Sequence, residues 1–355
     1  MKKAFKKFLL TLIGIACLFA SCKKDKQIIN DNNETTNPFE TGVFIVNEGA
    51  FQTGTGTVSF LNRSTKVVKQ DVFNLVNNRP LGNVAQSMTI FNDKAYIVVN
   101  NAAKVEVVDA KTFKSVGVIN DVSLPRFFIG VSSIKGYVSS WSGKISVINL
   151  SDNSITKTIN VGGSPDKMIA TGGKAYIIGS AGFTSDSTFH IIDIASDTKL
   201  NTLVIGDNPS DMVLDANNKI WIICGAIPHW VDSNNTKNAV LVKFNPTTNS
   251  VEQTFDLGSK NFGAKIVINA AKTKLFYTLS NGIYAMDVNN PVVSQMPFIA
   301  KSFYAIGFDN TESILYGADP KLYTGNGWVY RYNATSASVV DSFQVGIIPT
   351  FFSFN

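Results

Sequence analysis

The chain has 355 residues, of which 45% are hydrophobic and 16% are charged, and a formal net charge of +6. This composition is typical of an ordered protein and excludes an intrinsically disordered one. Four of the positive charges lie within residues 2–7. The rest of the chain is therefore only weakly basic, and its scattered charges do not predict nucleic-acid binding.

The N-terminus is typical of a secretory signal, with basic residues followed by an apolar run over residues 8–20 that is short for a membrane span. Residues 18–22, LFASC, resemble a bacterial lipobox, although Phe19 stands where leucine is commoner. The resemblance implies that residues 1–21 are a lipoprotein signal peptide and that Cys22 is the diacylglyceryl-modified first residue of the mature chain. An ordinary signal peptide with an incidental cysteine is the alternative.

Residues 22–40 are polar and lack a hydrophobic period, which predicts a flexible tether. The charged tetrad at residues 23–26 is similar to the surface-export signals of some Gram-negative lipoproteins. We therefore expect an outer-membrane lipoprotein at the cell surface, with a periplasm-facing anchor as the alternative. Cys17 lies in the signal and Cys22 is the lipid site, so Cys224 has no disulfide partner and is expected to pack in the core.

Residues 41–355 repeat a unit of about 40 residues with four strand signals. The clearest copy predicts strands at 167–170, 175–179, 188–193 and 201–205. An aromatic residue on the second strand marks each of seven copies: Phe44, Tyr96, Tyr137, Tyr176, Trp221, Phe276 and Tyr316. Four strands per repeat are typical of a β-propeller blade. We predict an all-β, seven-bladed β-propeller over residues 41–355; a β-solenoid or two β-sandwiches are the alternatives.

The two ends of the repeated region are incomplete in complementary ways. The first copy begins at its aromatic strand, residues 42–46, without an inner strand before it. The last segment, residues 349–354, is an inner strand with nothing after it, and it opens with proline as several inner strands do. We therefore predict that the C-terminal strand pairs into the first blade and closes the ring, which removes two exposed sheet edges.

The starts of the inner strands converge at one mouth of the channel in a propeller, together with the loops that follow the second strands. Several of these loops are long, and long loops on a rigid scaffold often bind ligands. Aromatic side chains on them would make a flat platform. The ligand-binding candidates are Asn47, Glu48, Phe51, Gln86, Arg126, Trp141, Asp166, Lys167, Asp211, His229, Trp230, Lys265, Tyr304 and Tyr323.

Each of these candidates has a structural alternative. The polar residues at the inner-strand starts could form a solvated rim, and the loop aromatics could fold back over the blade edges. The other histidine, His190, lies inside a predicted strand and is expected to pack there. His229 alone could bind a metal or a corrinoid cobalt, although one histidine is a weak signal.

No catalytic pattern stands in a suitable context in this sequence. An enzyme such as a lactonase or a quinoprotein-like oxidase would need a carboxylate-rich channel. The nearby candidates are Glu48, Asp166 and Asp211, and Lys167 and Lys265 offset them. We therefore expect no enzymatic activity and no cofactor.

The repeated segments at residues 95–98, 104–109 and 157–165 resemble the YncE-like, or YVTN-type, seven-bladed propellers over nearly all of residues 41–355. The opening at residues 42–49 and 56–60 is similar to surface lipoproteins that carry this propeller, including a BtuG-type branch. The resemblance implies capture of cobalamin or another nutrient for a TonB-dependent outer-membrane transporter. Because loops decide the ligand, a protein- or glycan-binding propeller is the alternative.

Overall fold

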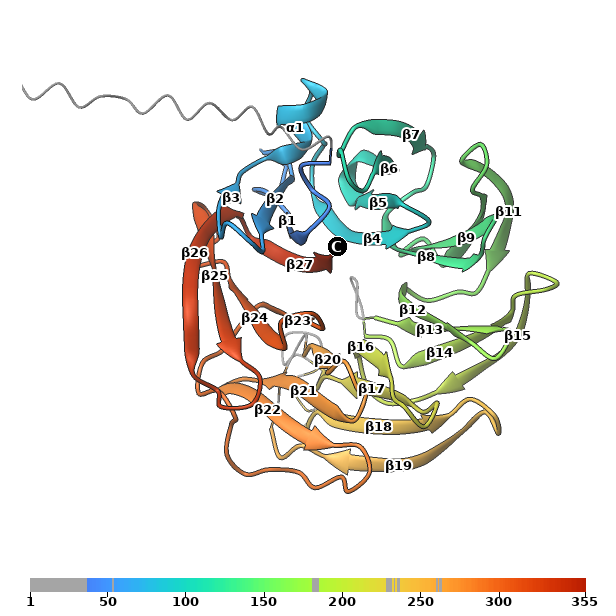
Figure 1. The fold of residues 1–355 in the computed structure, drawn as a ribbon. Helices are drawn as coiled ribbons and strands as arrows, with labels where there is room; N and C mark the ends of the chain where they lie inside the picture. The colour runs from blue at the N-terminus through green and yellow to red at the C-terminus, as the bar shows by residue number, and fades with distance from the viewer. Residues whose placement is uncertain are drawn as a thin grey trace, which may run out of the picture. The chain divides into compact units, whose positions relative to one another are not determined.

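The computed structural model describes residues 37–52, 54–180, 185–227, 232, 234, 237–259, 261 and 264–355. Within these residues, seven antiparallel sheets stand around one axis as the blades of a β-propeller (Figure 1). The predicted all-β fold with seven blades is therefore confirmed. The predicted signal peptide, Cys22 and the tether as far as residue 36 lie outside the described residues.

Each blade runs from an inner strand at the channel to an outer strand at the rim. Blade 1 has β27 (Pro349–Phe354), β1 (Gly42–Asn47), β2 (Thr57–Asn62) and β3 (Val68–Lys69); blade 2 has β4 (Ala85–Phe91), β5 (Lys94–Val99), β6 (Lys104–Asp109) and β7 (Ser115–Ile119); blade 3 has β8 (Pro125–Ser132), β9 (Lys135–Ser140), β10 (Lys144–Asn149) and β11 (Ser154–Asn160). Blade 4 has β12 (Pro165–Thr171), β13 (Lys174–Gly179), β14 (Thr188–Asp193) and β15 (Thr198–Val204); blade 5 has β16 (Pro209–Leu214), β17 (Ile220–Cys224), β18 (Val240–Asn245) and β19 (Ser250–Asp256). Blade 6 has β20 (Ile266–Ile268), β21 (Lys274–Leu279) and β22 (Gly282–Asp287); blade 7 has β23 (Ala305–Asp309), β24 (Ile314–Asp319), β25 (Asn326–Asn333) and β26 (Val339–Ile347).

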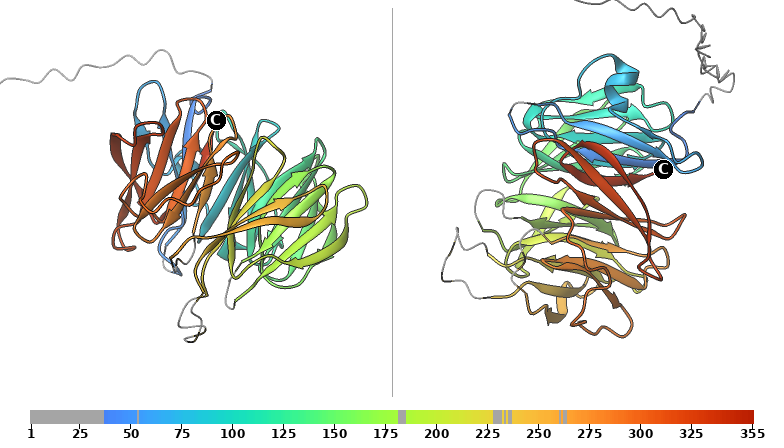
Figure 2. Two further views of the ribbon diagram at one scale, coloured as in Figure 1. Left: turned by 90° about the horizontal axis from the view of Figure 1, so that it is seen from below. Right: turned by 90° about the vertical axis from the view of Figure 1, so that its left-hand side faces the viewer.

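The side views in Figure 2 show that the connections between strands lie at the two faces of the ring. Four inner strands open with proline as predicted, at Pro125, Pro165, Pro209 and Pro349. Proline is tolerated there because the first residue of a strand need not donate a ladder hydrogen bond. In blade 6, Ile299 forms an isolated bridge to Ile283 at the edge where a fourth strand lies in the other blades.

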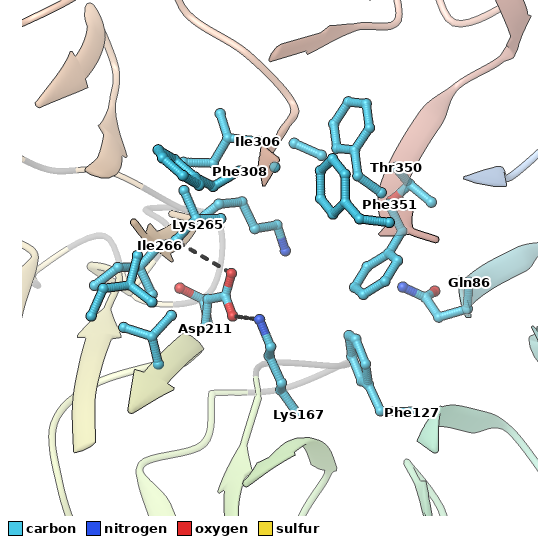
Figure 3. A pocket seen from close by; sticks show the side chains of 18 residues that line it. Gln86, Phe127, Lys167, Asp211, Lys265, Ile266, Ile306, Phe308, Thr350 and Phe351 are labelled. Atoms are coloured by element: carbon cyan, nitrogen blue, oxygen red, sulfur yellow. Dashed lines mark hydrogen bonds and ion pairs between the residues drawn. The ribbon is translucent and has the colours of Figure 1, made fainter. Parts of the chain in front are cut away.

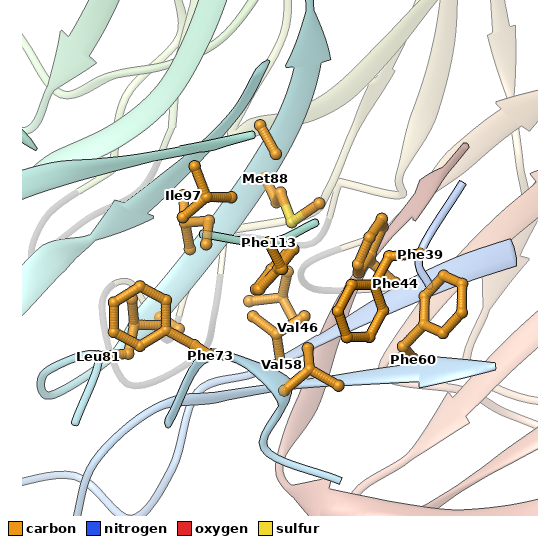
Figure 4. Packing of buried hydrophobic residues seen from close by; sticks show 14 of the residues in the cluster. Phe39, Phe44, Val46, Val58, Phe60, Phe73, Leu81, Met88, Ile97 and Phe113 are labelled. Carbon is orange, nitrogen blue, oxygen red and sulfur yellow. The ribbon is translucent and has the colours of Figure 1, made fainter. Parts of the chain in front are cut away.

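The seven predicted aromatic residues all lie on second strands and are at most 1% exposed. Their rings fill the wedges between neighbouring blades. Tyr96 of blade 2 stacks on Phe128 of blade 3, with ring centroids 3.8 Å apart. Between blades 1 and 2, Phe44 and Phe113 stack at 4.9 Å and Phe39 packs beside both (Figure 4). Each buried ring of this kind contributes about 1.5–3 kcal/mol to stability.

The C-terminal strand closes the ring as predicted. Strand β27 pairs antiparallel with β1, which places Phe351 opposite Val46 and Phe352 opposite Ile45. The Phe352 ring also packs on Tyr316 of blade 7, with centroids 5.5 Å apart. Blade 1 is therefore built from both ends of the propeller, and its inner strand is also a contact to blade 7.

Three smaller features differ from the sequence-based expectations. A short helix, α1 (Val72–Asn77), follows β3, and a 3-10 turn, η1 (Asn100–Ala102), follows β5. The helix has too few residues to show a helical period, and it is held by burial of Val72 and Phe73. The outer strand of blade 4 begins at Thr198, three residues before the predicted start, because its exposed residues show no apolar alternation.

Cys224 and His190 are both buried, as expected from their place in the repeats. Burial raises the pKa of the Cys224 thiol, so this free cysteine stays protonated. His190 contacts the hydroxyls of Thr188 and Thr202 through its two ring nitrogens. No helix in the described part of the chain is long and apolar enough to cross a bilayer.

Candidate functional site

A cleft of about 670 Å³ opens where the loops after the second strands meet the starts of the inner strands. Blades 1, 2, 3, 6 and 7 all contribute to its wall. Eight of the predicted ligand-binding residues line it: Glu48, Phe51, Gln86, Arg126, Trp141, Lys265, Tyr304 and Tyr323. The propeller geometry therefore brings together residues that are up to about 275 positions apart in the chain.

A smaller cavity of about 230 Å³ continues along the inner strands in the channel (Figure 3). Gln86, Lys265 and Thr350 line both this cavity and the cleft, so the two spaces meet at these side chains. The predicted residues Lys167 and Asp211 line the inner cavity. The site is thus an open cleft above a narrower channel segment, with a shared polar junction.

Arg126 organises one wall of the cleft. Its Nε donates to Asp166 Oδ2 at 3.0 Å, and its Nη1 donates to the side-chain oxygen of Gln86. The guanidinium lies 3.7 Å from the centre of the Trp141 ring, whose Nε1 donates to the same Asp166 oxygen at 2.8 Å. This cation–π pair with a shared carboxylate fixes the Trp141 ring at the cleft wall.

Aromatic side chains form the opposite rim. Tyr304 and Tyr323 pack edge to face with centroids 5.9 Å apart, and the Tyr304 hydroxyl donates to Glu48 Oε1 at 3.1 Å. Burial raises the pKa of Glu48, and burial beside Glu48 raises the pKa of Tyr304. Phe51 is 65% exposed and Tyr323 is 50% exposed, so both rings remain open to a ligand.

The inner cavity combines one ion pair with one further lysine. Lys167 pairs with Asp211, which also accepts the Ile266 backbone N–H at 3.2 Å. The Lys265 side chain extends into the cavity in Figure 3. Among the residues that the structure describes, no carboxylate lies within 4 Å of the Lys265 ammonium.

The remaining predicted site residues lie elsewhere. Asn47 is fully buried, and its amide donates to Thr57 and Ser59 on β2, each at 3.1 Å, so it supports blade 1 and does not line the cleft. Asp166 is also buried and acts on the cleft through Arg126 and Trp141. His229 and Trp230 lie outside the described residues.

The cleft also contains residues that are not among the predicted ligand-binding candidates, including Asn100, Asp319, Lys321 and Thr350. Thr350 occupies the same inner-strand position as Gln86 and Arg126, which is the sequence signal that relates it to the cleft. Lys321 lies in the long loop after β24 and donates to Asp319 at 2.9 Å. Within the described ranges, no three His, Cys, Asp or Glu side chains gather as they would at a metal site.

The fold and this cleft define a β-propeller of seven blades with a ligand-sized opening at one end of its channel. The chain belongs to the family described as a domain of unknown function (DUF5074), whose model matches residues 41–350. No curated protein matches the sequence.

Two solved structures share the fold at low sequence identity. A quinonprotein alcohol dehydrogenase-like protein from Bacteroides thetaiotaomicron matches with a TM-score of 0.68 and 14% identity, covering 90% of this chain and 79% of that one. Hydrazine synthase from Kuenenia stuttgartiensis matches with a TM-score of 0.62 and 14% identity, covering 75% of this chain and 88% of that one. Identity at this level supports the shared propeller and carries no activity to this chain.

Proposed function

We propose that this protein binds a small organic ligand in the mouth cleft without transforming it. The observation that carries the proposal is the convergence of eight sequence-selected side chains from five blades on one cleft of about 670 Å³. Clefts of a few hundred cubic ångströms with aromatic walls and a few placed polar groups are typical ligand sites. Open rings at Phe51 and Tyr323 supply the apolar contact, and Arg126 and Lys265 supply polar contacts.

Binding without catalysis is favoured by the state of the carboxylates. Asp166 is held by Arg126 and Trp141, and Asp211 is held by Lys167 and two backbone N–H groups. Glu48 accepts a hydrogen bond from Tyr304. Each carboxylate that the sequence offers for chemistry is thus engaged in positioning the cleft.

The biological setting that we propose is nutrient capture by a surface lipoprotein. Lipidation at Cys22 would hold the propeller at the outer membrane, and the cleft would pass its ligand to a TonB-dependent transporter, as the resemblance to YncE-like surface lipoproteins implies. The apolar rim is suited to a protein partner, because Leu322 is 83% exposed beside Tyr323. Labelling cells with a palmitate analogue tests the anchor: Cys22→Ser should lose the label, and retention of the label would exclude this site.

Cobalamin is the specific ligand that the resemblance suggests. A corrinoid is larger than the drug-sized molecules that clefts of this volume enclose, so it would insert one part and cover the aromatic rim with the rest. Titration of the purified protein with cyanocobalamin by calorimetry tests this version. We expect binding that Phe51→Ala weakens and that Ile134→Ala, a change at a 68% exposed residue outside the cleft, leaves unchanged. If micromolar cyanocobalamin gives neither heat of binding nor a shift in melting temperature, cobalamin is excluded as the ligand.

A further inference from the structure

We propose that the ligand of the mouth cleft is an organic anion, with a flat apolar body at the aromatic rim and an oxyanion group at Lys265. The oxyanion is a carboxylate, phosphate or sulfonate, since all three present oxygens to an ammonium group in the same way. This inference rests on the proposed function and deepens it, because it names the chemical class of the ligand.

Lys265 differs from the other basic residues near the junction in its position and in its lack of an ion pair among the described residues. It lies at the junction where the cleft meets the inner cavity, and its side chain extends into the open space (Figure 3). The other two basic residues near the junction each contact an aspartate: Arg126 contacts Asp166 and Lys167 contacts Asp211. In the described part of the chain, Lys265 forms no such ion pair. The Glu48 carboxyl acts on it only through space and accepts a hydrogen bond from Tyr304, so the ammonium is available to a ligand.

Gln86 supplies a second donor at the same junction. Its side-chain oxygen accepts a hydrogen bond from Arg126, which directs the amide nitrogen away from the guanidinium. Figure 3 shows the Gln86 amide facing the cavity from the side opposite Ile266. An ammonium and an amide N–H that face one narrow space form a site for an oxyanion, and partial burial strengthens the interaction.

The charges that line the two spaces favour the same ligand. The four basic side chains that line the two spaces are Arg126, Lys167, Lys265 and Lys321. Their carboxylate counterparts are Glu48, Asp211 and Asp319 in the lining and the buried Asp166, which pairs with Arg126. Asp319 at the rim is contacted by two lysines, Lys321 at 2.9 Å and Lys301 at 3.4 Å. Glu48 opposes an anion when it is ionised, and it is hydrogen-bonded to Tyr304. With the second lysine at Asp319, the groups around the two spaces carry a surplus of one positive charge, and protonation of Glu48 increases it.

The geometry also sets the shape of the ligand. The Trp141 ring is fixed by Arg126 and Asp166 on one wall, and Phe51, Tyr304 and Tyr323 lie on the other. Flat apolar groups bind between such rings by offset stacking or edge contacts. An aromatic acid or phosphate ester would place its ring in the cleft and its charge at the junction.

The test uses a matched pair of probes, naphthalene-2-sulfonate and naphthalene-2-sulfonamide, titrated into the purified protein by calorimetry at neutral pH. The two probes share the ring system and differ in charge. We expect the sulfonate to bind about tenfold more tightly, which corresponds to one charge-assisted contact. Lys265→Gln should abolish this preference, Lys265→Arg should keep it, and Lys114→Gln, at an exposed turn after β6, should leave it unchanged. Thermal melting of each variant confirms that it is folded.

The possible failures separate the two proposals. If both probes bind equally and Phe51→Ala weakens both, the cleft is a ligand site and the anion inference is overturned. If the sulfonate preference survives in Lys265→Gln, the oxyanion is held elsewhere and the inference is overturned. If neither probe binds and cyanocobalamin does not bind either, both the proposed ligand-binding function and the inference about an anionic ligand are overturned.

Discussion

Trp221 in blade 5 and Trp141 at the channel mouth are held by the same kinds of contact. Trp221 donates its indole N–H to Asp215 at 2.8 Å, and Lys243 lies 5.5 Å from the centre of its ring. Trp141 has equivalent partners in Asp166, at 2.8 Å, and in the guanidinium 3.7 Å from its ring centre. Each indole therefore has one aspartate acceptor and one cation near its ring, a lysine for Trp221 and an arginine for Trp141.

Their surroundings differ. Trp221 is fully buried on a second strand, and its aspartate also accepts backbone N–H groups of the preceding turn. Trp141 follows a second strand and is partly exposed in the cleft. The same kinds of contact complete a blade core in one region and position a partly exposed ring at the cleft wall in the other. The two tryptophans differ chiefly in how deeply they are buried.

The largest change removes the scaffold on which both tryptophans depend. Deletion of residues 349–355 takes away β27, exposes the edge of β1 and removes the Phe352 contact to Tyr316. We expect loss of more than about 5 kcal/mol of unfolding free energy, because several buried side chains go at once. Circular dichroism melting measures this, and a synthetic peptide of residues 349–355 should restore part of the transition. An unchanged melting temperature would contradict closure by β27.

The second change tests the contribution of Trp221, the buried tryptophan, to stability. Trp221→Ala should lower the unfolding free energy by about 3–5 kcal/mol, because it leaves a cavity between packed strands. Trp221→Phe is the matched control, since phenylalanine occupies the same place in blade 6 at Phe276, and it should cost only about 1–2 kcal/mol. Urea unfolding followed by fluorescence distinguishes the variants. Equal losses for both would show that the hydrogen bond to Asp215 outweighs packing.

The third change tests Trp141, the partly exposed tryptophan at the cleft wall. Trp141→Ala should cost no more than about 1 kcal/mol of stability, because the ring is partly open to solvent, but it should weaken naphthalene-2-sulfonate binding about tenfold. Calorimetry and melting are measured on the same preparation. If Trp141→Ala destabilises the protein as strongly as Trp221→Ala, the two tryptophans play one role and the comparison fails.

The blade cores could be predicted because their signal recurs. Seven aromatic residues at one strand position are all buried, and four prolines open inner strands, so each repeat supports the others. The incomplete ends indicated the pairing of β27 with β1 for the same reason. Features that occur in only one repeat had no such support. Helix α1 was not predicted, because six residues are too few to show a helical hydrophobic period.

The cleft could be predicted in part. The common position at the inner-strand starts identified Gln86 and Arg126, and loop length identified Phe51 and Tyr323. The direction of a single side chain was not predictable. Asn47 adjoins Glu48 in the sequence, yet its amide points to β2 because alternate residues of an extended chain face opposite sides. Likewise, the contact of Arg126 with both Asp166 and Trp141 depends on side-chain geometry that spacing does not encode.

The smallest expected effect concerns the charge that opposes an anion in the cleft. Burial raises the pKa of Glu48 above its ordinary value, so this carboxyl takes up a proton earlier than an exposed glutamate as the pH falls. The protonated form is favoured by the folded state, so the stability that Glu48 costs at neutral pH is recovered as the pH falls through its raised pKa. Loss of its negative charge also removes repulsion of a bound sulfonate. We therefore expect affinity for naphthalene-2-sulfonate, which stays ionised, to rise about two- to threefold as the pH is lowered from neutral through the raised pKa of Glu48.

Glu48→Gln is the matched test of that titration. It should bind the sulfonate at neutral pH as tightly as the parent protein does once Glu48 is protonated, with a flat profile over the same range. His190 does not affect the measurement at higher pH, because burial lowers its pKa to about 4. Naphthalene-2-sulfonamide is the second control and should show no pH dependence in either protein. A flat profile in the parent protein would show that the charge of Glu48 does not affect binding. If Glu48→Gln keeps the pH dependence, a group other than Glu48 causes it. Either result would contradict the assignment of this effect to Glu48 in the cleft.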